Sequence, residues 1–433
     1  MGETTDGVEI SGPGGPRGGA NRNPFHVVPF LLVIVFTTVS FKAPSDGTLS
    51  AVQSLSDPVR QCTLGAAYLL ALALILLKPH RFIAVLGRNK IYLLSVVYVL
   101  ASALWSKYPG TVFVAFVHHV GFTSAVLCAI HFFDDDFCGF LSMLLAVSLP
   151  MVWGSIALAL FFPGRGVCSN GRWAGVGDHP NELGFICLIS VWSAASGICF
   201  LKSRIMKSAA LLTLGASAVC LYFCASVTSM ICSLFVIASF MLLIDRRLEK
   251  PEHLMMKLAA PAWGAAFALF LAWVLQPALM GRGYLFNLMG RQSDLSGRTE
   301  LWATGLGALA RKPFLGWSFD SMASVLSKQI ISYAQFHDGY LNLAVSGGLL
   351  GVILFALVLF KHARSSIRLL DHEYGASASL AVLVGAIIIH NISEASIMRV
   401  THPLWLLFLL CYFYIDRLDH GREKTADLDG PLG

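Results

Sequence analysis

Three short polar segments interrupt a largely apolar chain, and each contains a side chain that could handle a charged group. Arg172 lies in a glycine-rich segment, Arg298 follows a serine that could begin a helix, and His337 directly precedes a long apolar run. A guanidinium is permanently charged and can bind phosphate through two N–H groups. An imidazole titrates near neutrality and can act as a general base. These residue types could hold an anionic group and act as a general base.

The first segment runs from Gly171 to Gly184 and is dense in polar residues. Its glycines permit close approach of the backbone, and an Asp or Asn can cap the following helix. The segment also contains Asp178, His179 and Asn181. The alternative is a plain helix-start loop in which Arg172 contacts a lipid headgroup.

The second and third segments belong to the long connection 281–337. Ser296 could cap an amphipathic helix that ends before Pro313, with its apolar residues at helical spacing and Arg298 in its first turn. Arg291 lies shortly before this helix, and Asp338 follows His337 at the other end of the connection. The alternatives are a surface helix whose arginines only contact headgroups, and an ordinary interfacial histidine.

Other candidates carry weaker signals. Glu394 lies in a short turn near the end of the chain and is expected to be a minor participant. The run Asp134–Asp136 resembles an acidic metal site, but the alternation of loops assigns it to the opposite face. His118, His119 and His390 fall inside apolar runs and are expected to serve packing. The ten cysteines show no metal-ligand or disulfide spacing.

The segments are embedded in a membrane protein. Of 433 residues, 56% are hydrophobic and 13% are charged, whereas a soluble domain is about one-quarter charged. The sequence therefore predicts an all-α polytopic membrane protein with about twelve transmembrane helices. The apolar runs lie near residues 26–41, 62–77, 91–105, 111–133, 137–162, 183–201, 209–223, 227–244, 258–280, 340–360, 377–392 and 403–415.

The basic residues predict the orientation of these spans. Lys and Arg gather in alternate loops, near 78–90, 202–207, 246–257 and 361–368, and in the tail. The positive-inside rule assigns these loops and both termini to the cytoplasm. We therefore expect a disordered cytoplasmic segment 1–24, a transmembrane domain 25–416 and a cytoplasmic tail 417–433. The periplasmic loop 281–337 would contain amphipathic helices, and the candidate residues would share the periplasmic face. No basic stripe with interleaved aromatic residues suggests nucleic-acid binding.

Several motifs resemble those of the bacterial O-antigen ligase and polymerase superfamily, which includes exopolysaccharide polymerases. Their order, spacing and shared sidedness carry the resemblance more than any one motif does. They comprise Leu104–Pro109, Arg172–Gly184, Leu295–Trp302, Pro313–Trp317, His337–Leu341 and Gly347–Gly351. The Gly177–Asn181 stretch departs from the pattern, which leaves the roles of Asp178 and His179 open. The last external turn matches loosely, through Glu394.

The resemblance implies a GT-C-like, metal-independent, inverting glycosyltransferase of the bacterial inner membrane, without a cofactor. Such an enzyme takes a glycan from undecaprenyl pyrophosphate at the periplasmic face and transfers it to a glycan or lipid-linked glycan acceptor. Arg172 and Arg298 would bind the pyrophosphate and His337 would be the base. The further substrate-binding candidates are Arg291, His179, Asn181, Asp338 and Glu394. Polysaccharide export proteins are expected partners besides the lipid bilayer.

Alternative functions stay open at this point. The stretch Arg291–Trp302 is most similar to exopolysaccharide polymerases, which favours a polymerase over an O-antigen ligase that acts on lipid A-core. A transporter or flippase for lipid-linked glycan is the alternative of another class. The spans are nearly free of charged residues and the halves show no repeat, which favours surface chemistry. A structural subunit without chemistry is the third possibility.

Overall fold

The computed structural model describes residues 24–40, 58–244, 295–320, 322, 325, 335–399 and 401–428. Within them the chain is helical, apart from loops and one isolated bridge between Val167 and Trp173. Arg291 and the apolar run expected near 258–280 lie outside the described residues. Every other expected apolar run coincides with a helix, so the protein is an all-α, multi-pass membrane protein.

The helices follow one another along the chain without a strand between them in the described ranges. In order they are η1 (Pro24–His26), α1 (Val28–Thr38), α3 (Pro58–Leu77), α4 (Pro79–Arg88), α5 (Lys90–Ala101), η2 (Ser102–Leu104), α6 (Pro109–Phe133), α7 (Phe137–Phe161), α8 (Pro163–Gly166), α9 (Pro180–Phe200), α10 (Arg204–Cys224), α11 (Val227–Ile244), α14 (Leu295–Arg311), α15 (Gly339–Leu369), α16 (Tyr374–His390) and α17 (Pro403–Leu428).

Length and hydropathy identify six of the described helices as long enough to cross a bilayer: α3, α6, α7, α9, α10 and α15. A seventh span requires Phe82–Arg88 and Lys90–Leu104 together, and these are bent by 90° relative to each other. Several of these helices begin at a proline, including Pro58, Pro109 and Pro180. Proline suits the first helical position because its φ is already helical and that position needs no N–H.

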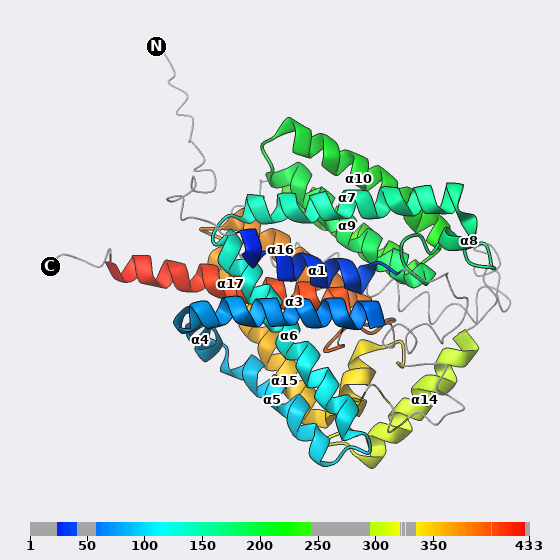
Figure 1. Ribbon diagram of the computed structural model, residues 1–433, viewed down its shortest axis with the longest axis vertical. Helices are drawn as coiled ribbons and strands as arrows, with labels where there is room; N and C mark the ends of the chain where they lie inside the picture. Colours follow the sequence, from blue (N-terminus) through cyan, green and yellow to red (C-terminus); the bar gives the residue numbers. More distant parts are fainter. Residues whose placement is uncertain are drawn as a thin grey trace, which may run out of the picture.

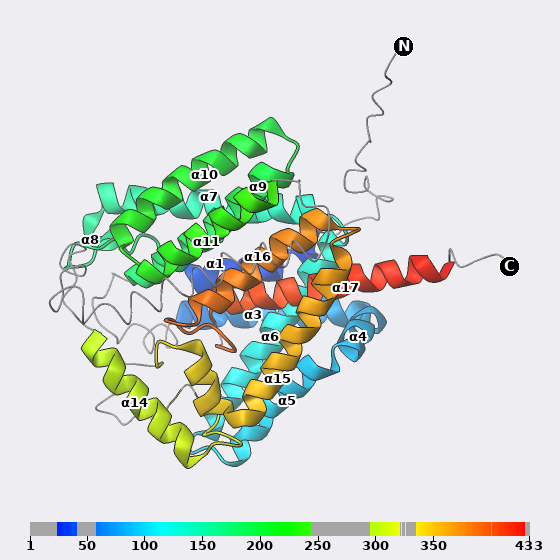
Figure 2. The ribbon, with the colours of Figure 1, turned by 180° about the vertical axis from the view of Figure 1, so that it is seen from behind.

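The bundle has two helical groups around a central helix (Figures 1 and 2). Helices α7, α9, α10 and α11 pack together on one side, and α3, α5, α6 and α15 pack on the other. Helix α17 contacts α6, α15 and α16. From Leu404 to Ile415 every α17 side chain is at most 2% exposed. A helix that is apolar all round is expected at such a position, because it has no solvent-facing side.

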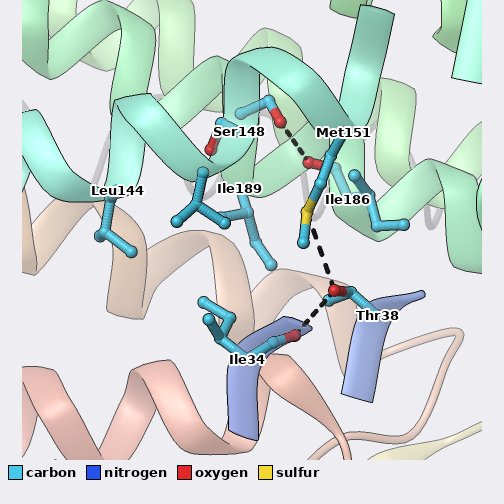
Figure 3. Close-up of a pocket in the computed structure, with 9 residues that line it drawn as sticks. Ile34, Thr38, Leu144, Ser148, Met151, Ile186 and Ile189 are labelled. Atoms are coloured by element: carbon cyan, nitrogen blue, oxygen red, sulfur yellow. Dashed lines mark hydrogen bonds between the residues drawn. The ribbon is translucent and has the colours of Figure 1, made fainter. Parts of the chain in front are cut away.

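Polar contacts and a small gap mark the region between the two groups. Trp192 Nε1 of α9 donates to Ser379 O of α16 at 2.8 Å. The gap lies between α1, α7 and α9, and Ile34, Leu144 and Ile189 are among its mostly apolar lining residues (Figure 3). Thr38 Oγ1 contacts Met151 Sδ across it at 3.7 Å and also bonds Ile34 O at 2.7 Å. The Thr38 hydroxyl is thereby satisfied within an apolar surrounding.

Helix α15 is broken at Gly348, where the backbone has φ +58°. The segment that follows α14 packs into this break: Leu349 N donates to Pro313 O at 2.8 Å, and Trp317 N donates to Val345 O at 2.8 Å. A Cβ on Gly348 would lie 2.4 Å from Phe314 O, so only glycine fits. The motifs 313–317 and 347–351 are therefore two halves of one backbone-to-backbone contact.

Helix α14 matches the helix predicted to begin near Ser296 and to end before Pro313. Leu301 and Ala308 are buried against Phe336, and Trp302 Nε1 donates to Phe336 O at 2.8 Å. Leu306, which belongs to the same apolar spacing, is 59% exposed. The α14 contact fixes the backbone position immediately before His337.

Candidate functional site

Glu394 is the centre of a polar network at one end of the bundle, called here the site end. Its Oε1 accepts from Asn181 Nδ2 at 2.9 Å, and its Oε2 lies 3.1 Å from His337 Nδ1. The Glu394 residue is only 8% exposed. The sequence predicted a minor role for Glu394, whereas the structure makes it the link between the α9 start and the α15 start. The available signal was that Glu394 is the only acidic residue between His390 and His402.

Arg172 joins the same network through Asn181. Its Nη2 donates to Asn181 Oδ1 at 3.3 Å and to Ala225 O at 3.4 Å, and its Nε donates to Cys224 O at 2.9 Å. The carbonyls belong to the C-terminal end of α10, where the helix presents partial negative charge. These acceptors are all uncharged, so the guanidinium is oriented without being neutralised.

The loop that carries Arg172 is held by its neighbours. Trp173 stacks on Phe223 with ring centroids 4.2 Å apart, and Trp173 N donates to Phe223 O at 3.1 Å. Burial lowers the pKa of Arg172, and the charge of Glu394 acts in the opposite direction. An arginine titrates so far above neutrality that the group stays charged at physiological pH.

His337 has a backbone φ of +51°, which turns the chain sharply before α15. Its Nδ1 faces Glu394 Oε2 at 3.1 Å and Gln335 Nε2 at 3.3 Å. An ionised carboxylate can only accept, so we assign the Nδ1 proton to a bond toward Glu394. Gln335 Nε2 can only donate, so with this tautomer its 3.3 Å approach to Nδ1 is a contact and not a hydrogen bond. This tautomer makes Nε2 the nitrogen that accepts a proton, as in other carboxylate–histidine pairs.

Two neighbouring residues fix the position of this turn. Asp338 Oδ1 accepts from Tyr340 N and Leu341 N, each at 2.9 Å, and so caps α15. Gly339 N donates to Asn391 O at 2.8 Å, and a Cβ on Gly339 would lie 2.0 Å from Asn391 Oδ1. Asp338 is therefore placed as a helix cap, and its part in substrate binding stays a prediction. Desolvation raises the pKa of Asp338, and the two backbone bonds act against that shift.

His179 is likewise placed as a helix cap. Its Nδ1 accepts from Asn181 N at 3.2 Å at the start of α9. Burial lowers the pKa of His179, and the charges of Arg172 and His337 lower it further, whereas those of Glu394 and Asp178 raise it. The neutral form that this shift favours is the form whose Nδ1 can accept. His179 thereby orients Asn181.

Arg399 belongs to the site end and was not singled out from the sequence. Its Nη1 donates to Gln335 Oε1 at 2.6 Å and to Ala395 O at 3.3 Å. The contacts Arg172–Asn181–Glu394–His337–Gln335–Arg399 thus form a continuous chain. The only sequence signal was a basic residue in the turn that carries Glu394.

The backbone of Arg298 belongs to α14. It lies in the first turn of α14, one turn before Trp302, whose indole is bonded to the carbonyl that precedes His337. The fold therefore brings the backbone of the Arg298 helix to the His337 turn. Arg291, the other arginine predicted from this connection, lies outside the described residues.

Comparisons with known proteins give two sequence similarities. The family model described as O-antigen ligase matches residues 209–356. The chain is also similar to the exopolysaccharide production protein ExoQ of Rhizobium meliloti (strain 1021), with 24% identity over 264 residues. That match covers 57% of this chain and 58% of ExoQ, so it spans little more than half of either protein. These matches support the resemblance of this multi-pass membrane protein to the bacterial O-antigen ligase and polymerase superfamily.

Proposed function

We propose that the protein is an inner-membrane glycosyltransferase that polymerises lipid-linked oligosaccharide repeat units at the periplasmic face, from an undecaprenyl pyrophosphate donor. The observation that carries this proposal is the Glu394 bridge between His337 Nδ1 and Asn181 Nδ2, with Arg172 bonded to the same asparagine. A base and a permanent cation are thus held in one network. An inverting transfer from a diphosphate needs these two groups.

The proposed reaction is a single displacement. An acceptor hydroxyl attacks the anomeric carbon as the bond from that carbon to the diphosphate oxygen breaks. The hydroxyl proton passes to His337 Nε2, and Glu394 stabilises the imidazolium that results. The diphosphate leaves with the bonding electron pair, and Arg172 offsets its growing negative charge, assisted by Arg298. Two guanidiniums supply the positive charge that a metal ion provides in other enzymes.

The preference for a polymerase rests on similarity. The relative is named for exopolysaccharide production, and the Arg291–Trp302 stretch is most similar to exopolysaccharide polymerases. The description of the matching family model supports the alternative of an O-antigen ligase with a lipid A-core acceptor. Both enzymes share the donor and the chemistry proposed here.

A transporter for lipid-linked glycan is the competing function. The polar network from Arg172 to Arg399 joins loops and helix ends rather than the middle of the described spans. Transport pathways usually carry polar groups or broken helices near the bilayer midplane. Helix α15 does have a break at Gly348, but the segment after α14 fills it, with Leu349 N bonded to Pro313 O. The location of this network therefore favours surface chemistry.

The test is glycan elongation by purified protein in detergent with a lipid-linked oligosaccharide, because detergent abolishes transport but not transfer. We expect Arg172→Gln and His337→Ala to lower the rate at least about 100-fold. Arg165→Gln is the matched control, since Arg165 is an exposed guanidinium in α8 on the same stretch of chain. Wild-type rates in both site variants, at equal melting temperature, would refute the proposal.

A further inference from the structure

Two guanidiniums at the site end, beyond those of the proposed transfer reaction, are held by uncharged acceptors. Arg399 contacts Gln335 Oε1 and Ala395 O through one nitrogen, Nη1. Arg60, in the first turn of α3, donates from Nη2 to Thr37 O at a long 3.4 Å, and its buried Nε has no hydrogen-bond partner. Within the described part of the chain, neither arginine is ion-paired with a carboxylate.

Both arginines lie at the site end. Arg60 is bonded to Thr37 O near the end of α1, and just beyond that end Ser40 N donates to Val176 O at 2.8 Å, in the loop that carries Arg172. The charge of Arg60 lowers the pKa of both Arg399 and His402, in addition to the larger effect of burial. Arg60 is tied to the end of α1 and Arg399 to the turn before α17, so two different parts of the fold bring their charges together. Two like charges in partly buried positions repel each other, and an anion between them would remove that repulsion.

The nearby carboxylates are engaged with other groups. Glu394 and Glu182 raise the pKa of Arg399 through their charge. Both oxygens of Glu394 already contact Asn181 and His337, and Glu182 Oε2 accepts from Asp178 N at 3.1 Å. Arg399 therefore keeps N–H groups that a ligand can use. A planar guanidinium matches a carboxylate or phosphate group through two parallel bonds.

The order of the contacts in the polar network indicates which part of the substrate would carry an anion bound by Arg399 and Arg60. Arg172 lies at one end of the network, and Arg399 lies beyond His337 at the other. In a displacement with inversion, the leaving group and the attacking hydroxyl lie on opposite faces of the anomeric carbon. If Arg172 holds the leaving diphosphate, a cation beyond the base lies on the acceptor side.

We propose that Arg399 and Arg60 form a specificity site for an acidic acceptor, in which they bind the carboxylate of an acidic sugar close to the attacking hydroxyl. This inference rests on the proposed function, because it uses the direction of the transfer. It assigns a class to the acceptor: a glycan whose end carries a uronic acid or a carboxylated substituent. The phosphate of an anionic lipid headgroup offers similar chemistry and is distinguished by the experiment.

The first measurement is binding, which does not depend on catalysis. Protein in nanodiscs of uncharged lipid is titrated with an oligosaccharide that ends in glucuronic acid and with its carboxyl-reduced, neutral analogue. We expect at least tenfold tighter binding of the acidic form, and we expect Arg399→Gln and Arg60→Gln to remove that preference. Equal binding of the two glycans by the wild type would overturn the proposal, even if the protein proves to be a transferase.

The second measurement is the acidic-over-neutral ratio of kcat/KM for the acceptor. The site variants should lower this ratio at least tenfold, mainly through KM, whereas Arg165→Gln should keep the wild-type ratio. A merely structural role, such as holding Gln335 beside His337, would reduce kcat equally with both acceptors and would contradict the proposal. Absence of transfer by the wild type, with its binding preference for the acidic glycan intact, would count against the transfer reaction and leave the acidic-glycan site supported.

A third measurement tests whether the two arginines bind a lipid headgroup rather than an acidic glycan. Nanodiscs that contain phosphatidylglycerol are compared with uncharged ones, and lipid that copurifies with each variant is quantified. We expect the same acidic preference in both membranes and equal retained phosphatidylglycerol in wild type and variants. Loss of bound phosphatidylglycerol in Arg399→Gln and Arg60→Gln, with no change in glycan preference, would assign the arginines to a lipid and refute the acidic-acceptor site.

Discussion

The two ends of the bundle use charged residues in opposite ways. At the end away from the site, Asp416 of α17 accepts from Arg88 Nη2 at 3.1 Å, Lys361 Nζ at 2.7 Å and Asn89 Nδ2 at 3.0 Å. Asp419, one turn later, is ion-paired with Arg368. Figure 1 shows this end of α17 projecting away from the side on which α8 and α14 lie. Each cation named here is matched by a carboxylate.

The acidic run at the α6–α7 turn belongs to this paired set. The sequence offered Asp134–Asp136 as a weak metal-site candidate on the face opposite to the proposed chemistry. In the structure, Arg417 is ion-paired with Asp134 and Asp135, while Asp136 caps α7 by accepting from Gly139 N at 2.8 Å. These carboxylates join α17 to the neighbouring helices.

At the site end, Arg172, Arg399 and Arg60 contact carbonyls and side-chain amides instead. In a salt bridge within the fold, the two opposite charges compensate each other. A guanidinium bonded to neutral acceptors keeps an uncompensated positive charge, which can attract an anionic ligand. The contrast teaches that the location of charge alone does not mark a site. What marks it is positive charge that the fold orients and leaves uncompensated.

The largest expected effect comes from removing the charge of Glu394. Glu394→Gln keeps the shape of the side chain but takes away the carboxylate that holds the Nδ1 proton of His337. We expect the transfer rate to fall about 100-fold or more, because the imidazole loses its orienting anion. Initial rates of elongation, at a melting temperature close to that of the wild type, check this. A wild-type rate in Glu394→Gln would show that this carboxylate is not needed for transfer, and would contradict the contrast between the two ends.

The matching change at the opposite end is Asp416→Asn. It leaves Arg88 and Lys361 without their shared carboxylate, and these two side chains are each 27% exposed, so solvent screens part of the loss. We expect a loss of stability of about 2 kcal/mol, between the values typical of exposed and buried pairs. Thermal unfolding measures it. The rate per folded molecule should stay at the wild-type value, and a large fall in that rate would contradict the comparison.

The smallest expected effect is the pH dependence that two histidines at the site end contribute to stability. His179 Nδ1 accepts from Asn181 N, and His402 Nδ1 accepts from Leu404 N, each at 3.2 Å. Burial lowers the pKa of both histidines, so the unfolded chain binds more protons than the folded one. Their contribution is therefore full above the ordinary histidine pKa, near 6.5, and is lost as the pH falls below it.

Each cap should contribute about 1 kcal/mol. The double variant His179→Asn and His402→Asn keeps an acceptor at both positions but cannot titrate. Melting temperatures at pH 8 and pH 5 should therefore differ less in this variant than in the wild type. An identical pH dependence in the two proteins would show that the caps do not contribute.

The site could be predicted only in part from the sequence. Arg172, Asn181 and His337 stood out because they are polar residues beside apolar runs, and the structure joins them in one network. His179 and Asp338 were singled out by the same criterion, yet their side chains cap helices. Arg399 was missed, since nothing in its local pattern separates a site arginine from any other basic residue in a loop.

The sequence by itself determined the helices, because apolar runs of membrane length, prolines at the first helical position and capping residues act locally. Only the tertiary structure decided that Glu394 lies between Asn181 and His337, which are 213 and 57 residues away from it in the chain. It also decided that Gly348 and the 313–317 segment share one backbone contact. The physical reason is that a hydrogen bond about 3 Å long depends on how helix ends pack in space, and local patterns do not record that packing.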